Sequence, residues 1–125
     1  KMRIRKLLNN SVFVKESLKR EDLASAIMQA ECVVVPSLTE GFGFSAIEAC
    51  QMGTSLIYSN GGALPEVSYG KCRSFENRDS KDLANKLLHV IDYSQDAFEQ
   101  IPEKTFTYKE MIDGIEKLYE DVLKK

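Results

Sequence analysis

The sequence predicts an α/β fold in which helices cover both faces of a parallel sheet. Short apolar runs alternate with longer segments whose apolar residues recur every three or four positions. Turn residues, above all glycine, separate the two kinds of segment. With 125 residues, of which 43% are hydrophobic, the chain can close one modest domain. Strands that alternate with helices form parallel sheets joined by right-handed crossovers.

Four apolar runs are the expected strands. Residues 11–14 follow two asparagines and give the first. Residues 32–35 are a cysteine and three valines closed by Pro36, a pattern typical of a central strand buried on both faces. Residues 55–58 form the next strand and residues 71–75 a further short one.

Helical spacing marks four further segments. Helices are expected at residues 20–30, 44–52, 80–92 and 108–123, and residues 1–8 resemble the end of another. Gly53 follows the second helix and ends it. The last helix carries an apolar stripe wider than one edge of a small domain can cover. The stripe consists of Tyr108, Met111, Ile112, Ile115, Leu118, Tyr119 and Val122. We therefore expect it to stay partly exposed and to self-associate.

Composition excludes several classes of function. Seventeen basic against nineteen acidic residues give a net charge of −2, which does not attract nucleic acid. Three widely spaced cysteines without a C-x-x-C pair indicate neither a disulfide framework nor a zinc site. No apolar run approaches the roughly 18 residues of a membrane span. Three unpaired cysteines fit a reducing compartment, so a cytoplasmic protein is expected.

One segment differs from the rest of the chain and is the expected functional site. Between Cys32 and Gly70 there is no lysine or arginine, yet six of the seven glycines fall there. Two glycine-rich loops, at residues 39–43 and 60–62, follow expected strands. Ligands of parallel sheets bind at the carboxyl ends of the strands, so both loops should border one crevice.

The first loop leads directly into a helix. The backbone N–H groups of Gly43, Phe44 and Ser45 would then be unpaired donors at a positive helix end, which suits a phosphate. Glu40 and Glu48 flank these donors, and an ionised carboxylate accepts two hydrogen bonds from a sugar diol. The same crevice is therefore expected to hold a phosphate and a sugar.

Two stretches resemble a known family. Residues 33–50 read VVVPSLTEGFGFSAIEAC, and residues 60–67 read NGGALPEV. They resemble the retaining glycosyltransferases of the GT-B type, the glycosyl transferases group 1 family. Glu40 and Glu48 match its Glu-x7-Glu motif, and the wider resemblance covers residues 11–123.

The resemblance implies a role for each matching residue. Glu40 would contact the transferred sugar near the reacting carbon and be the catalytic residue. Glu48 would hold the ribose diol of the donor. The donor phosphate and sugar would be held by the backbone of the helix start, which here is Gly41, Phe42, Gly43, Phe44 and Ser45. The base would lie near Ser17 and Leu18. No metal or further cofactor is implied, because the nucleoside diphosphate sugar is itself the donor substrate.

In the family, the matching domain is the C-terminal, Rossmann-like half of a two-domain enzyme. Residues 1–125 would then be one nucleotide-sugar-binding domain, with the N-terminal acceptor domain and the first strands absent, and inactive alone. The implied partners are a nucleotide sugar and the missing acceptor domain or subunit. The full enzyme would add hexose to a glycan or lipid, either in the cytoplasm or peripheral to a membrane. Two alternatives are a noncatalytic interaction subunit of the same fold and an unrelated flavodoxin-like phosphate-binding domain.

Overall fold

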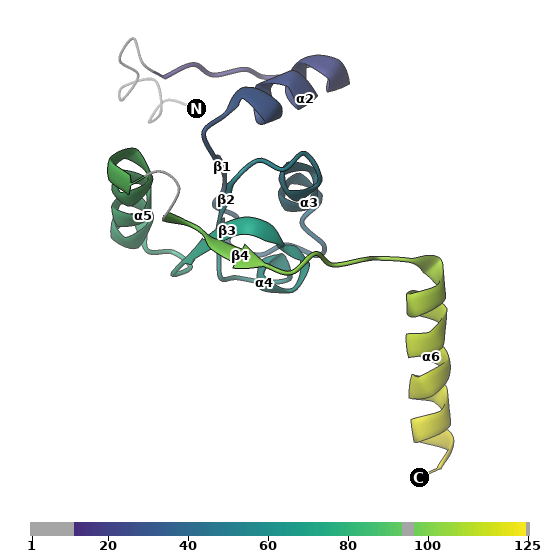
Figure 1. The fold of residues 1–125 in the computed structure, drawn as a ribbon. Coiled ribbons are helices and arrows are strands. Elements are labelled where there is room, and N and C mark those ends of the chain that lie inside the picture. The colour runs from purple at the N-terminus through teal and green to yellow at the C-terminus, as the bar shows by residue number, and fades with distance from the viewer. Residues whose placement is uncertain (1–11, 94–96, 125) are drawn as a thin grey trace.

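A computed structural model describes residues 12–93 and 97–124 of the chain. Its elements, labelled in Figure 1, are α2 (Arg20–Gln29), β1 (Val33–Val35), α3 (Phe44–Gln51), β2 (Leu56–Ser59), α4 (Leu64–Val67), β3 (Gly70–Phe75), α5 (Ser80–Tyr93), β4 (Glu99–Ile101) and α6 (Tyr108–Leu123). The expected α/β class is confirmed. The helix end that was expected at residues 1–8 lies outside the described residues.

The four strands of the described residues form one sheet in the order β1-β2-β3-β4. The first three strands are parallel, with Val34 opposite Ile57 and Ile57 opposite Arg73. β4 is antiparallel to β3 and pairs Ile101 with Gly70. The carboxyl ends of β1, β2 and β3 therefore meet at one edge of the sheet.

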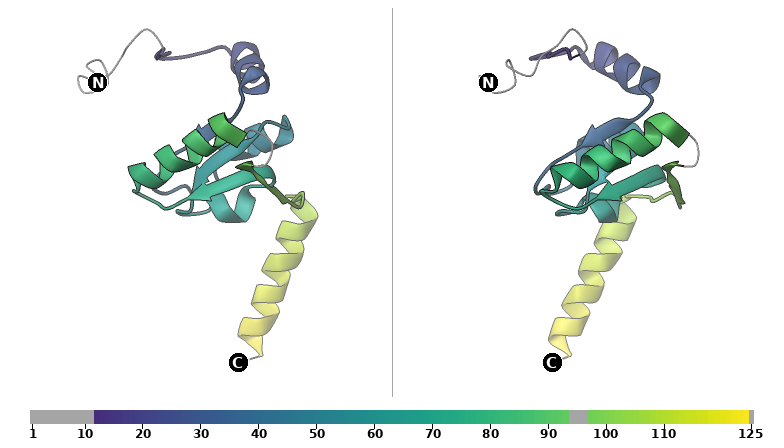
Figure 2. Two further views of the ribbon diagram at one scale, coloured as in Figure 1. Left: turned by 60° about the vertical axis from the view of Figure 1, so that its left-hand side comes forward. Right: turned by 90° about the vertical axis from the view of Figure 1, so that its left-hand side faces the viewer.

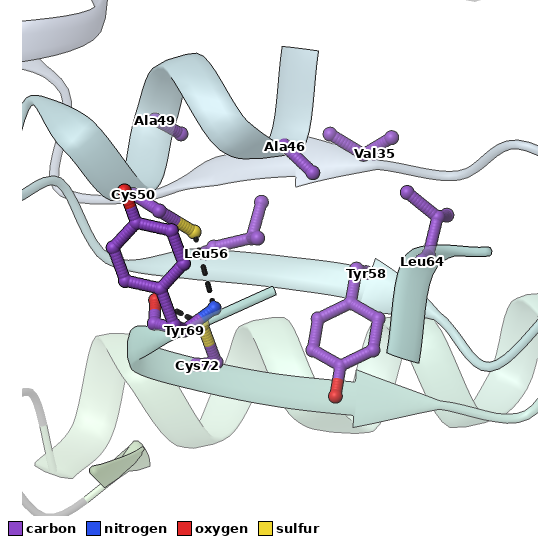
Figure 3. Close-up of a cluster of buried hydrophobic side chains, with 9 residues drawn as sticks. All are labelled: Val35, Ala46, Ala49, Cys50, Leu56, Tyr58, Leu64, Tyr69 and Cys72. Carbon is purple, nitrogen blue, oxygen red and sulfur yellow. Dashed lines mark hydrogen bonds between the residues drawn. The ribbon is translucent and has the colours of Figure 1, made fainter. Parts of the chain in front are cut away.

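Helices cover both faces of the sheet, as Figure 2 shows. One face packs under α3 and α4 around a cluster of buried side chains from these helices and the three parallel strands, drawn in Figure 3. The opposite face packs against α5, where Val90 lies with Ile57 and Phe75. β2 is the centre of the fold because all four of its residues are buried.

The prediction of a strand at residues 11–14 is wrong for residues 12–14, the part of this range that the structure describes. Val12, Phe13 and Val14 form no strand and are exposed. Consequently β1 lies at the edge of the described sheet instead of in its centre. Its Val33 and Val34 are only half-buried. An apolar run forms a strand only when a neighbouring strand accepts its backbone hydrogen bonds, and none does so here.

Two elements were not expected from the sequence. α4 is a four-residue helix with a proline in its first turn, inside a stretch that resembled a loop. β4 is a three-residue strand of sequence EQI and makes the sheet mixed instead of purely parallel. The other helices end within one residue of their expected limits.

α6 projects away from the sheet in all three views of Figures 1 and 2. None of its described residues is buried, and Tyr108 is 83% exposed. The expected partial exposure is therefore confirmed, whereas self-association stays a prediction. None of the helices in the described part of the chain is long and apolar enough to span a bilayer.

Candidate functional site

The two glycine-rich loops contact each other, as expected from the sheet edge they share. The backbone N–H of Ala63 donates to the carbonyl oxygen of Glu40 at 3.2 Å. Gly62 has a φ of +61°, and a Cβ atom there would lie 2.7 Å from the nitrogen of Glu40 and 2.9 Å from its oxygen. Only glycine allows the second loop to approach Glu40 this closely.

The loop after β3 joins the other two. The side-chain amide of Asn77 donates to the carbonyl of Leu38 at 2.8 Å. Its backbone N–H donates to the side-chain oxygen of Asn60, also at 2.8 Å. The side-chain amide of Asn60 in turn donates to the carboxylate of Glu76 at 2.8 Å. Hydrogen bonds therefore fix three strand-end loops relative to one another.

Glu40 is half-buried and held by neighbouring loops. The hydroxyl of Ser37 donates to Oε1 of Glu40 at 2.6 Å. Ser59, at the end of β2, donates its hydroxyl to the carbonyl of Ser37. The second oxygen of Glu40, Oε2, accepts no hydrogen bond from residues 12–93 or 97–124. One carboxylate oxygen is thus fixed, and the other is available to a ligand.

The start of α3 has the free donors expected from the sequence. Gly43 precedes the helix with a left-handed φ of +81°, and no side chain caps the helix there. Its carbonyl accepts from Ala46 and Ile47. Within the described residues, the N–H groups of Gly43, Phe44 and Ser45 have no hydrogen-bond acceptor. Unpaired amides at a helix N-terminus form a favourable position for an anion.

Glu48 lies one turn into α3 and is half-buried. It follows Phe44 by four positions, so both residues lie on the same side of the helix. Its buried neighbours Ala46, Ala49 and Cys50 pack in the cluster between α3 and the sheet instead. None of the described side chains forms a hydrogen bond or an ion pair with the Glu48 carboxylate.

An aromatic cluster borders the first loop. The ring of Phe42 lies 5.0 Å from that of Phe44 and 5.5 Å from that of Phe106, both edge to face. Phe42, Phe106 and the start of α6 line a cavity of about 610 Å³. Phe44 is nevertheless 71% exposed, so one face of the cluster remains uncovered.

Ser17 and Leu18 are not brought into contact with the glycine loops. Both are exposed in the segment ahead of α2, which Figure 1 shows beyond the β1 edge of the sheet. Their role toward a base stays a prediction. The only histidine of the chain, His89, packs its ring against Tyr93 at 4.8 Å in α5 and has no place in the site.

Some residues of the site could not be inferred from the glycine and glutamate pattern. Ser37 lies in the stretch that resembles the family, but that pattern does not predict its hydrogen bond to Glu40. Asn77 and Phe106 are distant in sequence and reach the loops only because β3 pairs with β2 and β4 pairs with β3. In the described part of the chain, no group of three or more potential ligands could hold a metal ion.

The arrangement is suited to a phosphorylated sugar compound. Free helix amides can bind a phosphate, and two carboxylates nearby can accept hydrogen bonds from hydroxyls. Comparison with known proteins agrees with this chemistry, because residues 1–105 match the family model for glycosyl transferases group 1. The chain belongs to the glycosyl transferases group 1 family. The flavodoxin-like alternative is thereby excluded.

Individual relatives are glycosyltransferases. The chain is 42% identical over 88 residues to the MMP alpha-(1->4)-mannosyltransferase of Mycolicibacterium hassiacum, covering 68% of this chain and 21% of that protein. It is 26% identical over 127 residues to the phosphatidylinositol N-acetylglucosaminyltransferase gpi3 subunit of Schizosaccharomyces pombe, covering 97% of this chain and 28% of that subunit.

A solved structure supports the same fold. Sucrose-phosphate synthase from Thermosynechococcus elongatus superimposes with a TM-score of 0.66 at 31% identity, covering 74% of this chain and 25% of the synthase. The α/β, GT-B-type fold is thus confirmed for this glycosyltransferase domain. The chain spans only 21% to 28% of the length of the mannosyltransferase, the gpi3 subunit and the synthase.

Proposed function

We propose that this chain is the donor-binding portion of a retaining glycosyltransferase that moves a hexose from a nucleoside diphosphate sugar to a glycan or lipid. The position of Glu40 carries the proposal. Its backbone joins the two glycine loops, Ser37 holds one of its carboxylate oxygens, and its loop leads into the free amides of α3. A carboxylate fixed beside an anion site can contact the sugar that the phosphate carries.

The roles of the remaining residues follow from their positions. The N–H groups of Gly43, Phe44 and Ser45 hold the diphosphate, and the positive end of α3 stabilises the charge that develops on it during transfer. Gly41 and Phe42 shape the loop ahead of them. Glu48, on the same side of α3, accepts hydrogen bonds from the ribose diol. We retain Ser17 and Leu18 as the proposed base contact.

The names of the relatives support hexosyl transfer, since one is a mannosyltransferase and another an N-acetylglucosaminyltransferase subunit. We infer that this chain works together with an acceptor-binding domain or subunit and needs no metal. The gpi3 protein is named as a subunit and as acting on phosphatidylinositol. This favours a lipid acceptor and a peripheral position at the membrane for the full enzyme, as opposed to a purely cytoplasmic one.

We propose further that the chain is inactive alone. Transfer requires an acceptor held about 3 to 3.5 Å from the anomeric carbon. The segment from Cys32 to Gly70 also has no lysine or arginine to stabilise the departing diphosphate. Nucleoside diphosphate release should therefore occur only when an acceptor-binding portion is supplied, and it should disappear in Glu40→Ala. Steady turnover by the 125-residue chain itself would contradict this.

Calorimetry with UDP, GDP and their sugar conjugates tests donor binding. Glu48→Gln should weaken binding of the nucleoside diphosphate by about 1 to 3 kcal/mol, or roughly 5- to 150-fold, the range for hydrogen bonds to a charged group. Glu40→Gln should leave nucleoside diphosphate binding unchanged and weaken only the sugar conjugate. Glu66→Gln, at an exposed position in the neighbouring α4, is the control and should change neither.

Two outcomes would contradict the assignment. Equal losses of nucleoside diphosphate binding in Glu40→Gln and Glu48→Gln would refute the division of roles. No binding of any nucleotide or nucleotide sugar by the folded chain would favour the noncatalytic interaction subunit instead.

A further inference from the structure

Two buried cysteines face each other at the end of α3 opposite the glycine loop. Cys50 lies in the last turn of α3 and is 8% exposed, and Cys72 lies in β3 and is fully buried. Both belong to the apolar cluster between α3 and the sheet. Figure 3 shows their sulfur atoms pointing toward one another. Elements distant in sequence thus bring two thiols together.

The backbone of Tyr69 holds both thiols in place. Its N–H donates to Sγ of Cys50 at 3.4 Å, and its carbonyl accepts from Sγ of Cys72 at 2.9 Å. Both thiols are therefore held beside the same peptide unit, inside the same buried cluster.

The two thiols differ in acidity. The neighbouring Cys72 thiol lowers the pKa of Cys50 to about 7, although burial acts in the opposite direction, and the backbone of Tyr69 and the charge of Lys104 lower it further. The same pairing, together with burial, raises the pKa of Cys72. Cys50 is thus the more acidic of the two thiols and is partly ionised at neutral pH, whereas Cys72 stays protonated.

Cys50 can also be reached from solvent. It lines a cavity of about 630 Å³ together with Tyr69 and residues of the segment between β4 and α6, including Lys104 and Phe106. Cys72 does not line this cavity. A small oxidant can therefore meet Cys50 first, whereas Cys72 is accessible only to Cys50.

We propose that Cys50 and Cys72 form an oxidation site, at which a peroxide converts the two thiols into a reversible intramolecular disulfide. The Cys50 thiolate attacks one oxygen of hydrogen peroxide, the O–O bond breaks, and the leaving hydroxide takes up a proton as water. Cys72 then loses its proton and attacks the sulfenic sulfur of Cys50. The S–S bond forms, the S–O bond breaks, and a second water leaves. The two thiols lose two electrons and the peroxide gains them.

The site is independent of the proposed donor binding. The Cys50–Cys72 disulfide would link the last turn of α3 to β3, whereas the amides proposed to bind the donor lie at the first turn of the same helix. Cys32 provides an internal control. It packs with the cluster on the opposite face of the sheet, and burial raises its pKa, which disfavours its thiolate.

Peroxide titration of the full 125-residue chain tests the proposal. Free thiols are counted by alkylation and mass spectrometry, and disulfides are located by peptide mapping. We expect two of the three thiols to be lost, the mass to fall by two hydrogen atoms, and one Cys50–Cys72 crosslink that a dithiol reductant reverses. Cys32→Ser should behave like the unchanged chain. In Cys72→Ser, Cys50 should stop at a sulfenic acid that dimedone traps.

Peptide mapping of the unchanged chain decides the matter even if a variant fails to fold. A disulfide that includes Cys32 would overturn the proposal. Cys50 and Cys72 that both remain alkylatable after peroxide has oxidised Cys32 would overturn it as well.

Discussion

Replacing Gly62 with alanine should cost much more stability than the same change at Gly53. Both glycines have a left-handed backbone, with φ values of +61° and +72°. Alanine in that conformation costs roughly 1 to 2 kcal/mol. At Gly53 no atom lies within 4 Å of the added Cβ, so this backbone cost is the whole effect.

At Gly62 the added methyl group also meets rigid atoms. It would lie 2.7 Å and 2.9 Å from the backbone nitrogen and oxygen of Glu40, and 3.3 Å from Cα of Thr39. Backbone held by hydrogen bonds cannot move as a flexible side chain does, and overpacking of this kind costs about 1 to 3 kcal/mol. The expected total for Gly62→Ala is therefore about 2 to 5 kcal/mol, a large share of the stability of a small domain.

Urea denaturation of the two variants measures the difference directly. Gly62→Ala should lose at least about 1 kcal/mol more free energy of unfolding than Gly53→Ala. Because the clash displaces Glu40, Gly62→Ala should also weaken binding of a nucleotide sugar, and Gly53→Ala should not. Equal losses of stability in the two variants would refute the close approach of the loops.

The remaining predictions concern α6. Glu110 accepts hydrogen bonds from Thr107 in a capping box, which lowers the pKa of the Glu110 carboxyl below its ordinary value of 4.5. The stabilisation is present above that value and is lost as the pH falls through the lowered pKa, so the protection factors of the amide protons in the first turn should decrease below about pH 4.5. Glu110→Gln should remove this pH dependence, and Glu116→Gln, in mid-helix, should retain it. The exposed stripe should make the chain dimerise in sedimentation, and Ile115→Glu should abolish that. A chain that is monomeric at high concentration and binds no hydrophobic dye would contradict this.

The elements that the sequence predicted well are those that local signals determine. α3 begins after Gly43 and ends before Gly53, and its apolar spacing is contained within the helix itself. α6 has a capping box and a stripe that needs no partner to be recognised. In contrast, β4 is a strand only because β3 lies beside it, and its sequence EQI carries no strand signal. Residues 12–14 carry the strand signal of an apolar run, but no described strand lies beside them to pair with.

The same distinction applies to the site. The loops, the free amides and the two glutamates follow from glycine spacing and from the rule that strand ends share an edge. The residues that hold these loops in place cannot be inferred in this way, because Asn77 and Phe106 reach the loops through contacts between segments distant in sequence. The Cys50–Cys72 pair was also missed, because the two residues share no motif and meet only across the interior.

The contacts of the segment that follows β4 have a consequence for how the chain folds as it is synthesised. The ammonium group of Lys104 donates to the carbonyls of Pro65 and Glu66 in α4, at 3.1 and 2.7 Å. Phe106 packs on Phe42 in the first glycine loop. A ribosome releases Lys104 and Phe106 well after the loops they hold. The parallel strands can therefore pair early during translation, but α4 and the first glycine loop gain these contacts only when the chain has emerged beyond Phe106.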